Sequence, residues 1–323
     1  MKYQEILNHV VSVILDGDNP KAVYDALHDL YNLLVEATGI SAHDNGDDAI
    51  FLETGKAISS AQAAHCLLEV ERTRRFVRGI VQAVHDLRKK FGNQRINILY
   101  AGTGPYSALV LPLTAIFSSK EIGFFLLEIN SLSMQAVKNL YERFSLQEYV
   151  QAYIQADAVK YQIPDDINIH LIISETMHQA LKDEPQVSIM NNLLPQLADG
   201  GIFIPQNITV NLLMIDGGRE IQNMFAPCNP PRQLLGTVYE IGMKKFPSIN
   251  ISRIAVPKET KGFTDLSLFT EIEIYGEEFL TAYNCGLNLP VRIGSADQYA
   301  GKTIEFEYVI AERPYYHYFA MES

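Results

Sequence analysis

The chain has 323 residues, of which 47% are hydrophobic, and it carries a formal net charge of −12 at pH 7. This length and composition predict a globular protein with room for two compact units, and they exclude a disordered or fibrous chain. The negative charge would repel nucleic acid phosphates and acidic membrane surfaces, so we expect no nucleic acid and no membrane as a partner, but a cationic or neutral ligand.

Three further features predict a cytoplasmic protein. Cys66, Cys228 and Cys285 lie far apart without C-x-x-C spacing, so we expect free thiols of a reducing compartment and no metal site. The N-terminal segment has apolar residues at helical spacing but neither a cationic start nor a cleavage site, which predicts a helix and not a signal peptide. The longest apolar run, "SALVLPLTAIF", is well short of the roughly 20 residues that span a bilayer.

Residues 1–90 are predicted to form helices joined by polar loops, with no strand. The last helical stretch, "SSAQAAHCLLEVERTRRFVRGIVQAVHDLRKKF", has Ser59 or Ser60 as its expected N-cap. We expect this helical segment to cover a ligand bound to the domain that follows.

Residues 91–205 show the pattern of a doubly wound domain. Short apolar runs ("INILYA", "GFFLLEI", "VQAYIQA", "IHLIIS" and "GIFIPQ") alternate, in the first part, with helical stretches such as "SLSMQAVKNLYERF". This alternation predicts a mostly parallel, Rossmann-like α/β sheet whose ligand site lies at the carboxyl ends of the strands.

Residues 206–323 alternate between apolar and polar side chains, as in "NITVNLLM", "TEIEIY" and "TIEFEYVI". This period predicts an antiparallel β-barrel or β-sandwich with no helix. We expect this domain to serve substrate binding or dimerisation.

Three successive predicted strands end in residues suited to a nucleoside ligand. Gly102 and Gly104 follow the first strand, where a tight turn and a close approach to a ligand require residues without Cβ. Glu128 ends the second strand, where a carboxylate can accept hydrogen bonds from both ribose hydroxyls. Asp157 follows the third strand and can accept a hydrogen bond from an adenine amino group.

NAD and S-adenosylmethionine both fit these three strand ends. An NAD site usually has a third glycine two or three residues after the second one, but Pro105, Tyr106 and Ser107 follow Gly104. This favours a ligand without a phosphate.

Five segments, in order, resemble the protein arginine methyltransferases, which are class I S-adenosylmethionine-dependent methyltransferases: "CLLEVERTRRF", "YAGTGPYS", "LLEIN", "IISETMHQALKDE" and "GGIFIPQ". The resemblance covers roughly residues 66 to 210. It implies S-adenosyl-L-methionine as the cofactor, with the methionine carboxylate held by Arg72. It also implies that Ala101, Gly102, Thr103 and Gly104 form the cofactor loop. Glu128 would then bind the ribose hydroxyls, and Asp157 and Ala158 would frame the adenine.

The most specific part of the resemblance is "SETMHQALKDE", which has the family's pair of glutamates nine residues apart, here Glu175 and Glu184. We expect this pair to bind different nitrogens of a planar guanidinium. On one straight helix the two would lie about 13 Å apart along the axis, so the segment must fold back. Pro185 favours this, because the residue before a proline leaves the helical conformation and proline suits the first turn of a new helix. We expect His178, within this segment, to be exposed on a loop.

The chain also departs from the family pattern. Tyr100 replaces the acid before the glycine turn, Tyr106 replaces the third glycine, and the late Thr-His-Trp signature is missing because the chain has no Trp. Its nearest counterpart is "AYNCGLNLPV". Since that signature loop helps to close the substrate pocket, its loss favours a small-molecule substrate over a protein.

The sequence therefore predicts an S-adenosylmethionine-dependent methyltransferase that N-methylates a guanidino or other cationic nitrogen of a small, arginine-like molecule. Three alternatives stay open: a methyltransferase of a hydroxyl or carboxyl acceptor, a cofactor-binding protein without turnover, and an NAD-dependent oxidoreductase. The resemblance also implies a homodimer, for which "DGGREIQNMFAPCNPP" is a candidate contact segment or an ordinary surface loop.

Overall fold

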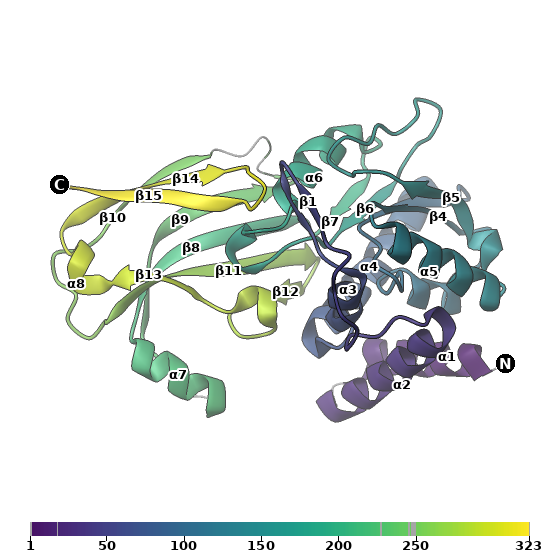
Figure 1. The fold of residues 1–323 in the computed structure, drawn as a ribbon, viewed down its shortest axis with the longest axis horizontal. Coiled ribbons are helices and arrows are strands. Elements are labelled where there is room, and N and C mark those ends of the chain that lie inside the picture. Colours follow the sequence, from purple (N-terminus) through teal and green to yellow (C-terminus); the bar gives the residue numbers. More distant parts are fainter. Residues whose placement is uncertain (1, 18, 227, 245, 247–249, 323) are drawn as a thin grey trace.

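The fold has helices and a parallel sheet at one end and antiparallel strands at the other (Figure 1). We describe it from a computed structural model, for residues 2–17, 19–226, 228–244, 246 and 250–322. The predicted fold class is confirmed: N-terminal helices, a Rossmann-like sheet and an antiparallel β region follow one another along the chain.

The N-terminal part contains four helices and one hairpin that the sequence pattern did not predict. The helices are α1 (Lys2–Asp16), α2 (Pro20–Thr38), α3 (Ser60–Cys66) and α4 (Val70–Phe91). The strands β1 (Ile50–Leu52) and β2 (Gly55–Ala57) pair antiparallel. The expectation of no strand before residue 90 was wrong, because strands of three residues are too short to show a two-residue period.

The helical stretch before the sheet is interrupted at residues 67–69, so it forms α3 and α4 in place of one helix. Ser59, not Ser60, is the N-cap of α3: its hydroxyl accepts a hydrogen bond from the Gln62 N–H, and the Gln62 side chain accepts one from the Ser59 N–H. This capping box fixes where α3 begins. The interruption places Arg72 in the first turn of α4, facing inward.

The parallel sheet has the strand order β5-β4-β3-β6-β7. Its strands are β3 (Ile96–Ala101), β4 (Ile122–Glu128), β5 (Val150–Gln155), β6 (Leu171–Ser174) and β7 (Ile202–Ile204), with α5 (Ser131–Arg143) and α6 (Gln186–Leu193) between them. The strand order reverses between β3 and β6, and ligands of such sheets bind outside the carboxyl ends at this switch point. The turn after β3 and the segment after β6 carry the glycines and the glutamates of the predicted site.

The C-terminal part is antiparallel, as expected, but it also contains helices. One sheet has the order β12-β11-β8-β9, with β13 beside β11, and the other has the order β10-β14-β15. The bounds are β8 (Asn207–Ile215), β9 (Arg232–Gly242), β10 (Ile251–Ala255), β11 (Asp265–Tyr275), β12 (Glu278–Leu280), β13 (Val291–Ser295), β14 (Lys302–Val309) and β15 (Tyr315–Glu322).

The expectation of no helix after residue 205 was wrong, since α7 (Gly217–Phe225) follows β8 and a short α8 (Ala296–Tyr299) follows β13. The side chain of Asp216 caps α7 by accepting a hydrogen bond from the Arg219 N–H. The Gly-Gly start of α7 is unfavourable for a helix and concealed it in the sequence.

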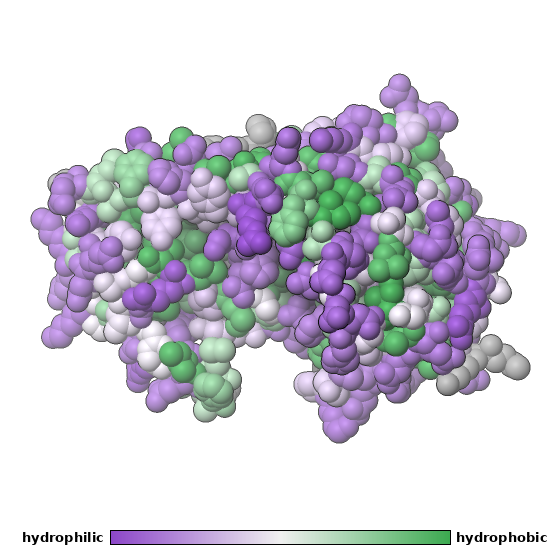
Figure 2. All heavy atoms as spheres, viewed as in Figure 1, coloured by the Kyte–Doolittle hydropathy of each residue, from purple (hydrophilic) through white to green (hydrophobic). Residues whose placement is uncertain are grey.

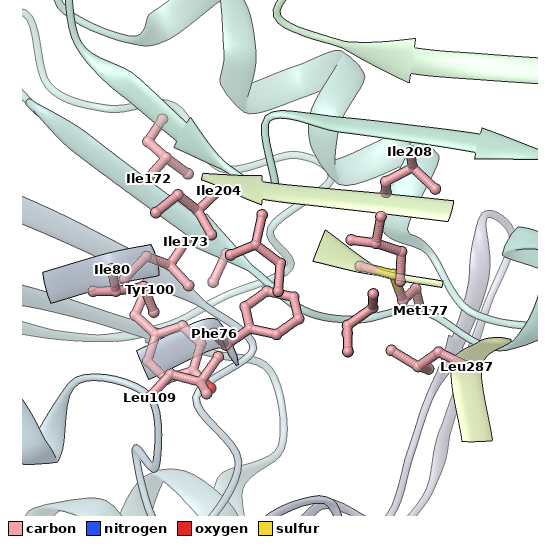
Figure 3. Close-up of a cluster of buried hydrophobic side chains, with 14 of the residues drawn as sticks. Phe76, Ile80, Tyr100, Leu109, Ile172, Ile173, Met177, Ile204, Ile208 and Leu287 are labelled. Carbon is pink, nitrogen blue, oxygen red and sulfur yellow. The ribbon is translucent and has the colours of Figure 1, made fainter. Parts of the chain in front are cut away.

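A continuous hydrophobic core joins the parallel sheet to the antiparallel part. Figure 3 shows Phe76 of α4 with Ile173 and Ile204 of the parallel sheet on one side of the view and Ile208 of β8, Met177 and Leu287 on the other. This packing holds the segments around the carboxyl ends of the strands in fixed positions. Within the described ranges, no helix is both long enough and apolar enough to cross a membrane.

Candidate functional site

A pocket lies at the carboxyl ends of β3, β4, β5 and β6, under α3, the start of α4 and the hairpin β1–β2. Most of the residues predicted for the site line it: Arg72, Gly102, Thr103, Gly104, Glu128, Asp157, Ala158, Glu175 and Glu184. Ala101 is the exception, because it is fully buried as the last residue of β3 and does not line the pocket. We refer to this cavity as the first pocket.

The glycine turn after β3 requires its glycines. Gly102 has φ of 79° and Gly104 has φ of 59°, a region that other L-residues rarely adopt. A Cβ on Gly102 would lie 2.5 Å from the side chain of Thr176, so the turn after β3 and the segment after β6 are in close contact. Tyr106, at the position of a third glycine, is buried and donates a hydrogen bond to the carbonyl of Ile40, 2.6 Å away. It therefore anchors the turn to the N-terminal segment.

Glu128 is buried at the end of β4, where its two carboxylate oxygens accept backbone hydrogen bonds from Gly104 (2.9 Å) and Asn130 (2.8 Å). Burial raises the pKa of this carboxyl group, and the two amide donors oppose that effect. Each oxygen keeps a second lone pair, so Glu128 can also accept hydrogen bonds from a ligand in the pocket.

Asp157 and Ala158 follow β5 on the same edge of the sheet. One carboxylate oxygen of Asp157 accepts a hydrogen bond from the Val159 N–H at 2.9 Å, which orients the side chain and leaves its other oxygen available. The pocket thus presents acidic side chains at the ends of two adjacent strands, where they can accept hydrogen bonds from a nucleoside.

The segment "SETMHQALKDE" folds back, as the nine-residue spacing required. A short 3-10 turn covers Gln179–Leu181, and Ala180, Leu181 and Asp183 have positive φ values of 52°, 58° and 65°. The next helix, α6, begins at Gln186 with Pro185 as its N-cap residue. The reversal returns Glu184 to the pocket that Glu175 lines.

Arg72 forms the centre of a buried ion-pair network. Its Nη1 donates to Glu69 at 2.6 Å and its Nη2 donates to Glu175. Glu69 also accepts a hydrogen bond from the Gly286 N–H, at 2.7 Å. Arg72 therefore has two carboxylate partners within the protein, Glu69 and Glu175. The other oxygen of Glu175, Oε1, is buried and has no hydrogen-bond partner.

Burial raises the pKa values of both glutamates. Burial is the main cause for Glu175, and Arg72 opposes it. Burial, followed by the charge of Glu175, raises the pKa of Glu184 to about 8. A buried orphan oxygen beside a carboxylic acid that is reluctant to ionise is a site suited to a cation, which would favour the charged form of both groups.

A second pocket adjoins the first, and Lys56, Ile58, Cys66, Arg72 and Glu184 line both. The loop "AYNCGLNLPV" reaches this second pocket through Gly286 and Leu287, so a wall is present although the Trp signature is not. His178 lines the same pocket and is exposed, as expected, with its Nδ1 3.6 Å from the carboxylate of Asp183.

The sequence analysis missed the residues of the hairpin and of α3 that line both pockets, namely Lys56, Ile58 and Cys66. The Thr-Gly pair at 54–55 between two short apolar stretches was the available turn signal. Burial raises the pKa of the Cys66 thiol to about 12, so this cysteine is not a nucleophile at neutral pH. No group of His, Cys, Asp or Glu in the part of the chain that the structure describes could hold a metal ion.

The comparisons with known proteins concern the fold. No protein-family sequence profile matches the chain, and no curated protein is detectably similar to it in sequence. Solved structures are similar: the Trypanosoma brucei PRMT1 enzyme–prozyme heterotetrameric complex with AdoHcy (11% identity, 81% of this chain and 98% of that chain, TM-score 0.54) and PRMT6 (11%, 80% and 99%, 0.53). Protein arginine methyltransferase 10 of Arabidopsis thaliana is also similar, with 12% identity over 77% of this chain and 87% of that chain, and a TM-score of 0.50. The chain therefore has the fold of the protein arginine methyltransferases.

Proposed function

We propose that this protein is an S-adenosylmethionine-dependent methyltransferase that acts on a guanidino or other cationic nitrogen. One observation carries the proposal: the segment after β6 folds back so that Glu175 and Glu184 line the pocket that also contains the glycine turn, Glu128 and Asp157. The similar structures include a PRMT1 complex with AdoHcy and PRMT6 with SAH, which supports the same cofactor here.

The residues present fit this cofactor. Glu128 would bind the ribose hydroxyls, Asp157 and Ala158 would frame the adenine, and Arg72 would bind the methionine carboxylate in exchange for one of its two glutamate partners. The orphan oxygen of Glu175 is available to a cationic group. When bound, the cofactor supplies an electrophilic methyl group on a sulfonium.

The two glutamates would prepare the acceptor nitrogen. By accepting hydrogen bonds from different nitrogens of a guanidinium, they would fix its plane and draw positive charge away from the nitrogen that attacks. As the new N–C bond forms, that nitrogen loses a proton. Glu184, which lines the pocket, would accept it.

We propose a small-molecule acceptor, a cytoplasmic location and a homodimer, with residues 1–90 covering the cofactor, 91–205 binding it and 206–323 serving the substrate or the dimer contact. The amphipathic α7 supports a contact, since Ile221, Met224 and Phe225 are exposed on it. Transfer to a hydroxyl or carboxyl acceptor is the alternative, with the glutamates then reassigned.

Calorimetry with S-adenosylhomocysteine tests the proposed function. We expect one binding site per chain for S-adenosylhomocysteine and no binding of NAD, because the buried Tyr106 stands where an NAD site has its third glycine. Glu128→Ala should weaken the binding of S-adenosylhomocysteine by about 10-fold or more, through loss of the ribose contact. NAD binding, or no binding of S-adenosylhomocysteine, would contradict the proposal.

The raised pKa of Glu184 predicts a pH-dependent affinity for cations. Below pH 8 Glu184 is mostly protonated, so a permanently charged guanidinium must displace a proton to pair with it. If only the ionised form binds, the affinity for arginine should rise roughly 50-fold between pH 6 and pH 8 and then level off. Titration calorimetry at several pH values measures this, and Glu184→Gln should flatten the profile. An affinity that is constant over this range in the wild-type protein would contradict the prediction.

A further inference from the structure

The second pocket is lined by both acidic and basic side chains. Its carboxylates are Glu69, Asp183 and Glu184, and its cations are Arg72, Lys56 of the hairpin β1–β2 and Arg313 of the turn between β14 and β15. Its volume of about 470 Å³ is in the range of small-molecule sites.

Lys56 and Arg313 converge on one aromatic ring. The Lys56 Nζ lies 5.8 Å and the Arg313 guanidinium 5.6 Å from the ring centroid of Phe51, whose side chain is 48% exposed. We call these three residues the rim. Figure 2 shows hydrophobic side chains gathered around the place where Figure 1 draws β1, between the parallel sheet and the antiparallel strands.

Backbone hydrogen bonds of one residue, Asp183, fix the position of the rim relative to the segment "SETMHQALKDE". The carbonyl of Asp183 accepts from the Lys56 N–H at 2.8 Å, and the Asp183 N–H donates to the carbonyl of Pro314 at 2.9 Å. Asp183 directly precedes Glu184, and Pro314 directly follows Arg313. Both rim cations are therefore tied to the segment that presents the acid.

The two rim cations lack carboxylate partners, although the chain as a whole is strongly acidic. Among the described residues, neither Lys56 nor Arg313 has a carboxylate within ion-pair distance. Lys56 is near enough to Glu184 to lower the pKa of that carboxyl group. The Lys56 Nζ donates a long hydrogen bond, 3.5 Å, to the side-chain oxygen of Gln62. Two cations that line the same pocket and lie beside one aromatic ring provide a site for an anionic group.

We infer that the second pocket binds a zwitterionic acceptor, with its carboxylate at the rim and its guanidino or amino group at Glu184, which lines both pockets, and at Glu175 of the adjoining first pocket. The inference rests on the proposed function and names the substrate class: a small cationic molecule that carries a free carboxylate. An arginine within a protein chain has no such carboxylate and leaves the rim cations unpaired.

Three ligands that differ at one end test the inference: arginine, its decarboxylated analogue agmatine, and arginine with both ends blocked as N-acetylarginine amide. Titration calorimetry, with and without S-adenosylhomocysteine, should show that arginine binds at least 10-fold more tightly than either of the other two. Arg313→Gln and Lys56→Gln should each reduce this preference by about 3-fold or more, and together they should abolish it while the affinity for agmatine changes little.

Lys138→Gln is the matched control, because Lys138 also lies 5.8 Å from an aromatic ring centroid, that of Tyr153, and does not line either pocket. It should leave the preference for arginine unchanged. Equal binding of arginine and agmatine, absence of arginine binding, or a preference that survives the double rim variant would each overturn the inference.

The two proposals fail in different ways. If S-adenosylhomocysteine does not bind but arginine is still preferred through the rim, the inference about the pocket stands and the proposed methyl transfer is wrong. If S-adenosylhomocysteine binds and the carboxylate makes no difference to the acceptor, the inference is wrong and the proposed methyl transfer stands.

Discussion

Glu175→Gln and Glu184→Gln are each expected to lower methyl transfer by at least about 10²- to 10³-fold, with the affinity for S-adenosylhomocysteine nearly unchanged. Glutamine keeps the volume and one acceptor oxygen of glutamate but removes the negative charge. The lost charge would no longer draw positive charge from the guanidinium, and the amide group would place an N–H donor where the cation needs an acceptor. The ground-state binding of the cofactor depends on other groups, among them Glu128 and Asp157.

The measurement uses methyl-labelled S-adenosylmethionine and a panel of guanidino, amino and hydroxyl compounds as acceptors, and calorimetry with S-adenosylhomocysteine on the same preparations. Glu142→Gln is the control, since Glu142 is exposed on α5 and lines neither pocket. Turnover that survives both substitutions would reassign the glutamates. A parallel loss of cofactor affinity would mean that the pair is structural.

The parts of the fold that the sequence predicted are those in which one local signal is sufficient. The central strands β3, β4 and β6 are buried apolar runs, and the glycine turn requires φ values that only glycine adopts easily. The reversal between Glu175 and Glu184 was predictable because one helix cannot bring the two together and Pro185 follows immediately.

The parts that the sequence did not predict depend on contacts between distant segments. The hairpin β1–β2 is held by the Lys56 N–H bond to Asp183, which lies 127 positions further along the chain. The partnership of Arg72 with Glu175 spans 103 positions, and the Gly286 N–H bond to Glu69 spans 217. Such pairings follow from the fold and leave no periodicity in the sequence.

The same long-range network makes Arg72 the position with the largest expected effect on stability. Arg72→Met should lower the free energy of unfolding by about 3–5 kcal/mol, because it removes the charged partner of Glu175 and leaves a buried carboxylate uncompensated. The loss should be smaller at pH 5 than at pH 8. Without Arg72, the pKa of Glu175 in the folded state rises further above its value in the unfolded chain. At low pH Glu175 is protonated in both states and the loss of stability disappears, whereas above the pKa of the unfolded chain the loss returns.

Urea denaturation at the two pH values measures the effect, and two further variants interpret it. Arg88→Met on the same helix removes an ion pair with Glu121 whose side chains are 35% and 32% exposed, so it should cost no more than about 1 kcal/mol. Combining Arg72→Met with Glu175→Gln should recover much of the lost stability, because the buried charge is then gone. A cost below 1 kcal/mol for Arg72→Met, or no recovery in the double variant, would show that the Arg72–Glu175 pair does not stabilise the folded protein.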